Sequence, residues 1–199
     1  MYDRQELGRI CRLQVQTSSL KAGPPRGRYY DPEPIRNATS LELTADGAVA
    51  IIDGECVVDV HNASHPETKN RQGINPLSIG FTSHYDQMRE HFDQHLVNGI
   101  AGENMLVETT RSVDFHQARA GFVIEGEDGR RIELGSVNIA HPCVEFSRFA
   151  LNDRAAAPLI VSAALGFLDN GLRGYYTSVA THEPLRVEVG DRVFAIYQG

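Results

Sequence analysis

The stretch GFVIEGEDGRRIELGSVNIA, residues 121–140, is the segment that most directly predicts the fold of this chain. Apolar residues alternate with polar ones on both sides of Asp128 and Gly129, a pair that favours a tight hairpin turn. Residues 40–53 repeat this pattern around Asp46 and Gly47, and residues 7–16, LGRICRLQVQ, alternate as a half-buried strand does. Short strands separated by tight turns at this density predict an all-β barrel rather than an α/β sheet.

The remaining segments complete a single predicted domain over residues 1–199. Residues 175–196 predict another strand pair, whose last turn is at Gly190 and Asp191. One helix is predicted over residues 83–99, with a capping box of Ser83 and Asp86 and a stripe formed by Tyr85, Met88, Phe92 and Leu96. A second helix is predicted from Pro158 to about residue 170, and residues 19–34 predict a long irregular loop.

Composition limits the classes of partner. The net charge of −7 and the pI near 5.6 argue against nucleic acid, since phosphate binding requires concentrated Lys and Arg. No stretch approaches the roughly 20 apolar residues of a membrane span, and the first residues lack the pattern of a secretory signal. The three cysteines are too scattered for a disulfide framework. We therefore expect a cytoplasmic protein with free thiols and no membrane partner.

Cys143 is the strongest candidate for chemistry. It directly follows Pro142 at the predicted end of a strand, with His141 and Arg148 close enough in sequence to stabilise a thiolate. The alternative is that Cys143 is a small buried apolar residue, as free cysteines often are. Cys11 and Cys56 lie within apolar strand patterns and are predicted to be core residues.

Two glycine-rich turns and several histidines are secondary candidates. The segment GIAGENMLV, residues 99–107, could present backbone N–H groups with Glu103 and Asn104 to a pocket, although most such turns are structural. Arg173 lies between two glycines and could bind an anion, unless the segment only ends a helix. His61 and His65 are followed by a proline that breaks helical spacing, and His91 with His95 lacks a third ligand. A polar surface is therefore favoured over a metal site.

These motifs occur in an order that resembles the MOSC domain family, named for the C-terminal domain of molybdenum cofactor sulfurases. The resemblance spans nearly the whole chain. Its elements are the opening strand LGRICRLQV, an Asp-x-His segment, Gly-x-x-Gly-Glu-Asn, Pro-Cys, Gly-x-x-Gly-Tyr and a closing Gly-Asp turn. In this chain they are Asp59 and His61; Gly99, Gly102, Glu103 and Asn104; Pro142 and Cys143; Gly171, Gly174 and Tyr175; Gly190 and Asp191.

The resemblance implies a closed, Greek-key-like β-barrel with peripheral helices, of the type also found in pyruvate kinase. It further implies that Cys143 carries sulfur as a persulfide or ligates the molybdenum of molybdopterin. The resemblance implies Gly102, Glu103, Asn104 and His61 as cofactor-binding residues, and His141, next to the Pro-Cys pair, is a further candidate. Arg173, Lys21 and Arg71 are candidates for the pterin phosphate that do not match family residues. A cysteine desulfurase would be the sulfur donor, and a molybdoenzyme or a redox protein the other partner. Pyridoxal phosphate is not expected on this chain.

The chain departs from the family pattern at two positions, where Ala140 and Val58 replace the usual arginine and glycine. Contacts to a cofactor at these points are therefore not implied. Thr82, Ser83 and His84, in a long polar segment before the first helix, are additional candidates for the pocket wall. A competing hypothesis from another class is a non-catalytic β-barrel that captures a small anion through the Gly-Glu-Asn turn and Arg173, with Cys143 only lining the wall.

Overall fold

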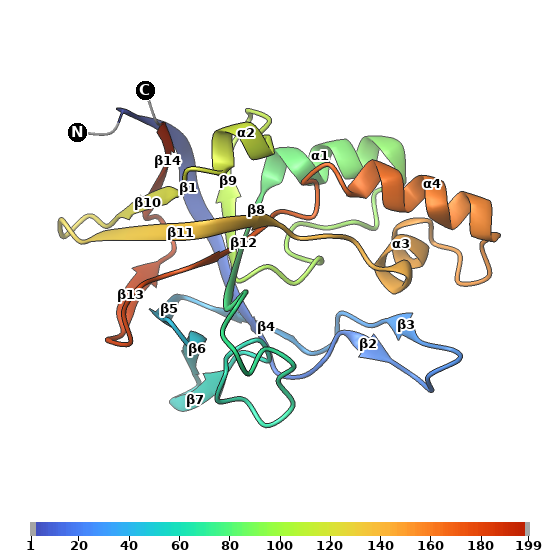
Figure 1. Ribbon diagram of the computed structural model, residues 1–199, viewed down its shortest axis with the longest axis horizontal. Helices are drawn as coiled ribbons and strands as arrows, with labels where there is room; N and C mark the ends of the chain where they lie inside the picture. Colours follow the sequence, from blue (N-terminus) through green and yellow to red (C-terminus); the bar gives the residue numbers. More distant parts are fainter. Residues whose placement is uncertain (1–2, 198–199) are drawn as a thin grey trace.

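The computed structural model describes residues 3–197 and is dominated by a closed β-barrel (Figure 1). Seven strands pair in the order β14-β10-β11-β12-β8-β9-β1, and β1 pairs with β14 to close the barrel. All neighbours in this barrel are antiparallel except β8 and β9, which are parallel. The barrel strands are β1 (Asp3–Gln16), β8 (Leu77–Phe81), β9 (Met105–Glu108), β10 (Phe122–Glu125), β11 (Arg131–Ile139), β12 (Tyr175–Ser178) and β14 (Arg192–Tyr197). The prediction of an all-β barrel is confirmed.

Smaller sheets and helices surround this barrel. A second sheet consists of β13 (Leu185–Glu188), β5 (Ser40–Thr44), β6 (Gly47–Ile52) and β7 (Glu55–Val58). β4 (Ile35–Ala38) pairs with the C-terminal end of β1. β2 (Lys21–Ala22) pairs only with β3 (Tyr29–Tyr30). The helices are α1 (Thr82–His91), α2 (Phe115–Ala118), α3 (Val144–Ala150) and α4 (Pro158–Leu168). None of the helices in the described part of the chain has the length and apolar character needed to cross a membrane.

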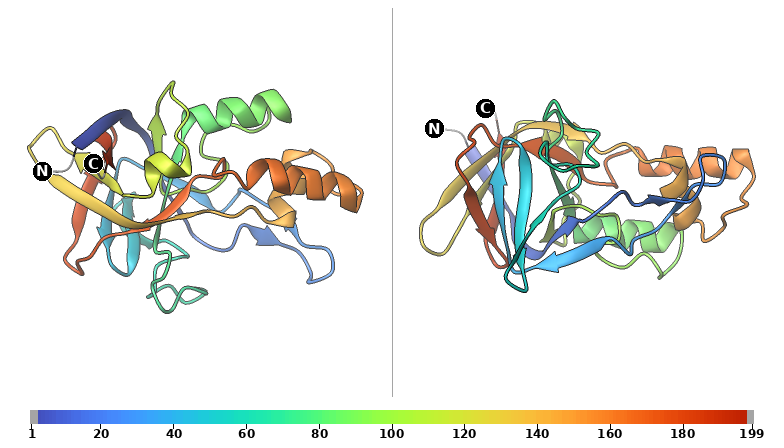
Figure 2. Two further views of the ribbon diagram at one scale, coloured as in Figure 1. Left: turned by 45° about the horizontal axis from the view of Figure 1, so that its top comes forward. Right: turned by 90° about the horizontal axis from the view of Figure 1, so that it is seen from below.

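Two hydrophobic clusters hold these parts together. The first fills the barrel with alternate residues of its strands, such as Leu13 and Val15 of β1 and Phe122 and Ile124 of β10. The second lies between the barrel and the helices and includes Phe146 of α3. Figure 2 shows α1, α3 and α4 gathered at the end of the molecule remote from the β10–β11 turn. The second cluster therefore attaches a helical region to one end of the barrel.

The local hairpins were predicted correctly, whereas the last strand pair was not. β5 pairs with β6 and β10 pairs with β11, each across the expected turn. β13 instead pairs with β5, and β14 pairs with β1 and β10, so the turn at Gly190 and Asp191 joins two sheets. This pairing depends on strands far away in the chain, which no local pattern reports.

The helix predictions were partly wrong. α4 agrees with the prediction within two residues and has Pro158 in its first turn. α1 ends at His91 rather than near residue 99, and its cap residue is Phe81, with no side-chain hydrogen bond, so the Ser83–Asp86 capping box is absent. The sequence did not indicate α2 or α3, since each is too short to establish a helical period.

Two of the three cysteines are exposed, contrary to the prediction that they are core residues. Cys11 lies where the register between β1 and β9 shifts, between Ile10 and Arg12, and its side chain is on the outer surface. Cys56 lies on β7, at the edge of the second sheet. Cys143 alone is partly buried.

Candidate functional site

A cleft of about 330 Å³ lies where the barrel meets the helical region, and Cys143 is in its wall. Six of the seven predicted site residues line it, namely Cys143, Gly102, Glu103, Arg173, His61 and His141. The sequence did not point to the other lining residues Gln16, Ser19, Leu20, Arg28, Tyr30, Val60, Glu67, Lys69, Ser78, Ala101 and Tyr176. Lys21, a predicted phosphate ligand, also lines the cleft, whereas Arg71 does not.

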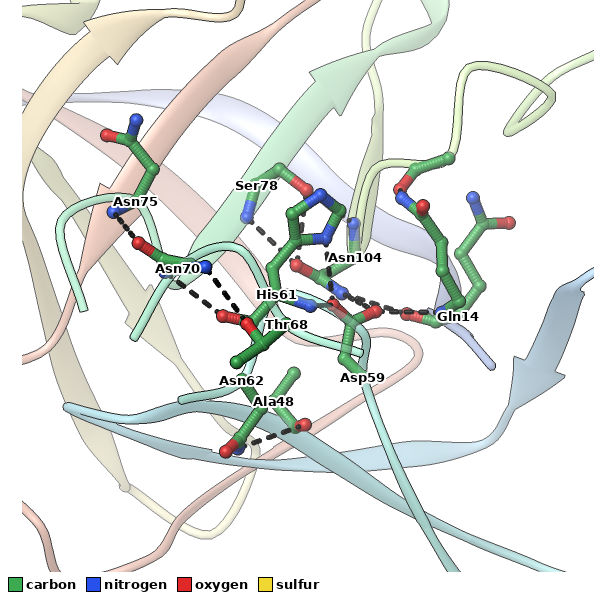
Figure 3. Close-up of polar contacts among 12 residues, drawn as sticks. Gln14, Ala48, Asp59, His61, Asn62, Thr68, Asn70, Asn75, Ser78 and Asn104 are labelled. Carbon is green, nitrogen blue, oxygen red and sulfur yellow. Dashed lines mark hydrogen bonds and ion pairs between the residues drawn. The ribbon is translucent and has the colours of Figure 1, made fainter. Parts of the chain in front are cut away.

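A buried carboxylate, Asp59, fixes one side of the cleft (Figure 3). Its Oδ2 accepts hydrogen bonds from the backbone N–H of Gln16 at 2.8 Å and from Nδ2 of Asn104 at 3.0 Å. Its Oδ1 accepts from the backbone N–H of His61 at 2.8 Å and lies 3.0 Å from Nδ1 of the same imidazole. Because both oxygens of the buried carboxylate have hydrogen-bonding partners, the cost of removing Asp59 from water is small. The same contacts hold His61 at the cleft.

Asn104 lies behind the cleft wall and does not line it. Its Oδ1 accepts hydrogen bonds from the backbone N–H of Ser78 at 3.0 Å and from the Ser78 hydroxyl at 3.1 Å. Its Nδ2 donates to the carbonyl oxygen of Gln14 at 3.3 Å as well as to Asp59. All the hydrogen-bonding capacity of the carboxamide is thus used within the protein, and Asn104 joins β1 to β8 rather than facing a ligand.

The turn before Asn104 is held in place by two glutamines of β1. Nε2 of Gln14 donates to the carbonyl oxygen of Gly99 at 2.7 Å, and Nε2 of Gln16 donates to that of Gly102 at 2.6 Å. Gly102 has a φ of +85°, and a Cβ atom there would lie 2.6 Å from Cδ1 of Leu20. Only glycine therefore allows this turn to approach the cleft floor.

A second turn of the same length brings Arg173 to the cleft. The N–H of Gly174 donates to the carbonyl oxygen of Gly171 at 2.8 Å, and the carbonyl oxygen of Gly174 accepts from Ala140 at 3.1 Å. A Cβ atom at Gly174 would lie 2.4 Å from the carbonyl oxygen of Ile79. The Gly-x-x-Gly spacing therefore serves close backbone packing between this turn, β8 and the end of β11.

Glu103 is a buried acid at the cleft. The Tyr85 hydroxyl donates to Oε2 of Glu103 at 2.9 Å and accepts from the backbone N–H of Ala101 at 2.9 Å. Oε1 of Glu103 is buried without a hydrogen-bond partner among the described residues. Burial raises the pKa of Glu103 above its ordinary value. A Cβ atom at Gly80 would lie 2.8 Å from Oε1, so the carboxyl group fills space that a larger residue would take.

Arg173 is held mainly by protein contacts. Its Nη1 donates to the carbonyl oxygen of Ala101 at 2.9 Å, and its guanidinium carbon lies 3.9 Å from the centre of the Phe146 ring. Its Nε is buried without a partner among residues 3–197. Arg173 thus contributes positive charge to the wall while it links the Gly99–Gly102 turn to α3.

Cys143 is the N-cap residue of α3. Its Sγ accepts a hydrogen bond from the backbone N–H of Phe146 at 3.5 Å, and the unpaired N–H groups of a helix start favour negative charge. The Lys21 ammonium lies 3.2 Å from Oε2 of Glu145, in the first turn of α3. Burial lowers the pKa of Lys21, but Cys143 and Glu145 together outweigh burial and hold it above its ordinary value. The thiol therefore lies beside both a cation, Lys21, and a carboxylate, Glu145.

The two predicted site histidines each pair with a carboxylate. His141 is exposed, and its Nδ1 lies 2.5 Å from Oδ1 of Asp169, so its partner is this carboxylate rather than Cys143. His61 pairs with Asp59. Within residues 3–197 no group of three or more His, Cys, Asp and Glu side chains is arranged to hold a metal ion.

The polar residues at the start of α1 are outside the cleft, contrary to the suggestion from sequence. The Thr82 hydroxyl donates to the carbonyl oxygen of Thr109 at 3.0 Å. Ser83 and His84 are buried, and Nε2 of His84 lies 2.9 Å from the carbonyl oxygen of Val113. The polar groups of Thr82 and His84 thus contact the loop that follows β9, whereas the Ser83 hydroxyl has no hydrogen-bond partner among the described residues.

No protein-family model matches this chain, and no curated protein matches it significantly. Among solved structures, the chain is similar to the YUAD protein from Bacillus subtilis, with a TM-score of 0.61 and 17% sequence identity over 100% of both chains. A second solved structure, of a hypothetical protein, has a TM-score of 0.52 and 16% identity, with 96% of this chain and 68% of that chain covered. At these identities the likeness establishes the shared fold, a barrel with peripheral helices.

Proposed function

We propose that this protein binds or transfers sulfur, or binds molybdenum cofactor, through the thiolate of Cys143. The observation that carries the proposal is the position of this thiol, at the first turn of α3 in a cleft that also holds Lys21 and Arg173. A buried inert cysteine needs none of these surroundings. The ordered motifs that resemble the MOSC family support the same assignment.

In the sulfur-carrier form, the Cys143 thiolate attacks the outer sulfur of a persulfide on a donor protein, such as a cysteine desulfurase. A new S–S bond forms on Cys143, the S–S bond of the donor breaks, and the donor cysteine leaves as a thiolate, so no external oxidant or reductant is required. The N–H of Phe146 and the Lys21 ammonium stabilise negative charge at this position. A molybdoenzyme would accept the sulfur.

In the cofactor-binding form, the residues of the cleft fit a molybdenum pterin. Cys143 offers the soft thiolate ligand, and the cations Lys21, Arg28, Lys69 and Arg173 line the same cleft and would hold an anionic phosphate. A cleft of about 330 Å³ lies within the roughly 300–1,000 Å³ of small-ligand sites. When bound, the metal would supply oxidation–reduction chemistry with a redox partner protein.

Mass spectrometry on matched cysteine variants tests the proposal. Because Cys11 and Cys56 are exposed, a Cys11→Ser/Cys56→Ser variant should still gain one sulfur atom when incubated with a cysteine desulfurase and cysteine. The same variant with Cys143→Ser in addition should gain no sulfur atom. Elemental analysis of protein purified from its own host measures bound molybdenum. Absence of both a sulfur adduct on Cys143 and bound molybdenum would refute the proposal.

The same set of cations also supports the second candidate, a non-catalytic barrel that binds a small anion. Lys21, Arg28, Lys69 and Arg173 would then be the binding groups, and Cys143 would be part of the wall. Anion binding that is unchanged in Cys143→Ser, without any sulfur or molybdenum on the wild type, would favour this function.

A further inference from the structure

A second cleft of about 330 Å³ adjoins the Cys143 cleft and shares Arg28 and Tyr30 with it. It lies between β3 and the region from α3 to the turn that follows, and these two segments pack against each other. Its other lining residues are Tyr29, Glu145, Arg148, Phe149, Asn152, Asp153 and Arg154. Apart from the shared Arg28, this arginine cleft takes no part in the chemistry proposed for Cys143.

Three guanidinium groups converge on the arginine cleft. Within residues 3–197, Arg28, Arg148 and Arg154 form neither an ion pair nor a side-chain hydrogen bond, and Nε of Arg148 is buried without a partner. Arg130, by contrast, forms ion pairs with Asp128, Glu188 and Asp191. Three arginines without protein partners around one concave site are therefore available to bind an anion, although the chain as a whole has a net charge of −7.

Two carboxylates also face the arginine cleft, and neither pairs with these arginines. Oε2 of Glu145 lies 3.2 Å from the Lys21 ammonium on the side of the Cys143 cleft. Oδ1 of Asp153 accepts a hydrogen bond from the backbone N–H of Ala155 at 2.8 Å. The charged groups that line the cleft are therefore three cations and two anions, and the anions are engaged elsewhere.

An aromatic ring orients one of these guanidinium groups, and a backbone turn brings two of the arginines together. The guanidinium carbon of Arg154 lies 4.0 Å from the centre of the Tyr29 ring, an arrangement that leaves the edge of the guanidinium free to donate hydrogen bonds. The N–H of Asp153 donates to the carbonyl oxygen of Arg148 at 3.1 Å, which places Arg148 and Arg154 on one compact turn. Planar forks held in this way suit the oxygen atoms of a phosphate.

We propose that Arg28, Arg148 and Arg154 bind a phosphoryl or diphosphoryl group of a ligand. The site needs neither sulfur nor molybdenum, so it goes beyond the function proposed for Cys143 and can be tested without it. Asn152, which also lines the cleft, offers an additional hydrogen-bond donor. The shared wall at Arg28 allows one ligand to extend from this group toward Cys143.

Isothermal titration calorimetry with inorganic pyrophosphate tests this site. The wild type should bind with saturation at one site, and Arg154→Ala, an exposed position that is safe for folding, should weaken binding by about tenfold or more. Arg148→Ala should have a similar effect. Arg26→Ala is the matched control, because it removes the same charge from an exposed position two residues from Arg28 and outside both clefts.

Two further variants separate this site from the Cys143 cleft. Ser19 and Lys69 line only the Cys143 cleft, so the binding event that Arg154→Ala weakens should keep its affinity in Ser19→Ala, and Lys69→Ala reports any separate binding in the Cys143 cleft. Loss of binding in Lys69→Ala with retention in Arg154→Ala would place the anion in the other cleft and overturn the proposal. No saturable binding to the wild type, or equal weakening by Arg26→Ala and Arg154→Ala, would also overturn it. None of these results depends on whether Cys143 carries sulfur.

Discussion

The buried imidazole of His84 gives this protein a defined sensitivity to acid. Nε2 of His84 lies 2.9 Å from the carbonyl oxygen of Val113, so the neutral ring donates there, while its Nδ1 is buried without a partner among the described residues. The ring packs with its centre 5.2 Å from that of Phe81 and 6.1 Å from that of Tyr175. Protonation would place a charge and an unpaired donor in this apolar site. Burial accordingly lowers the pKa of His84 from 6.5 to about 4.

The difference between these two pKa values sets the size of the effect. Above pH 6.5 His84 is neutral in both the folded and unfolded states, and stability is independent of its titration. As the pH falls from 6.5 toward 4, the unfolded state takes up the proton first, so the free energy of unfolding decreases. A pKa difference of this size corresponds to a loss of about 3 kcal/mol when the window has been crossed.

Urea unfolding at a series of pH values measures this loss. His84→Gln retains a donor for the carbonyl oxygen of Val113 but cannot be protonated. Near neutral pH it should be less stable than the wild type, because the packing contacts of the ring are lost. The stability gap should narrow by about 3 kcal/mol as the pH is lowered to about 4. Carboxyl groups titrate equally in both proteins and cancel in the comparison. The exposed His116→Gln is the control and should leave the pH dependence unaltered. A gap between His84→Gln and wild type that does not vary with pH would refute the reasoning.

Two further predictions concern the walls of the Cys143 cleft. Gly174 and Gly129 have nearly equal φ values, +83° and +85°, but only at Gly174 would a Cβ atom meet backbone, at 2.4 Å from the carbonyl oxygen of Ile79. Thermal unfolding should therefore show that Gly174→Ala costs about 2 kcal/mol more than Gly129→Ala, and equal losses would contradict the steric argument. Because burial raises the pKa of Glu103, the stability that its neutral form provides is lost as the pH rises above its ordinary value of 4.5. Glu103→Gln, which can still accept from Tyr85, should be more stable than the wild type at about pH 8 and little different near pH 4, and lower stability at pH 8 would argue against this account.

The elements that sequence predicted correctly are those fixed by neighbouring residues. The β10–β11 hairpin follows from alternation on either side of one turn, and α4 follows from Pro158 and a continuous apolar run. β13 was paired wrongly because its partner, β5, lies far away in the chain. Cys11 and Cys56 were placed in the core because alternation alone does not say which face of a strand is buried near a register shift or at a sheet edge.

In the candidate site, too, the parts carried by short local motifs were predicted and the parts that depend on distant residues were not. The Gly-Glu-Asn turn, the Pro-Cys pair and the Gly-x-x-Gly turn are short motifs that could be read directly, and all three reach one cleft. Tyr30 and Gln16 were not singled out because each reaches the site only through long-range packing. α3 was missed because cysteine is an unusual N-cap residue and the helix has only 7 residues.

The contacts of Arg173 change the role that its sequence position first suggested. Its guanidinium lies on the Phe146 ring of α3, and its Nη1 donates to Ala101 in the turn before Glu103. Phe146 in turn donates its backbone N–H to Sγ of Cys143. The position of the thiol and the position of the buried acid are therefore connected through one arginine whose hydrogen-bonding groups are partly committed to the protein. A residue with these contacts positions Cys143 relative to Glu103 first and can contribute only its remaining donors to an anion. Arg28, Arg148 and Arg154, whose side chains form no hydrogen bond or ion pair among the described residues, line the arginine cleft and have more of their donors available for the phosphate proposed there.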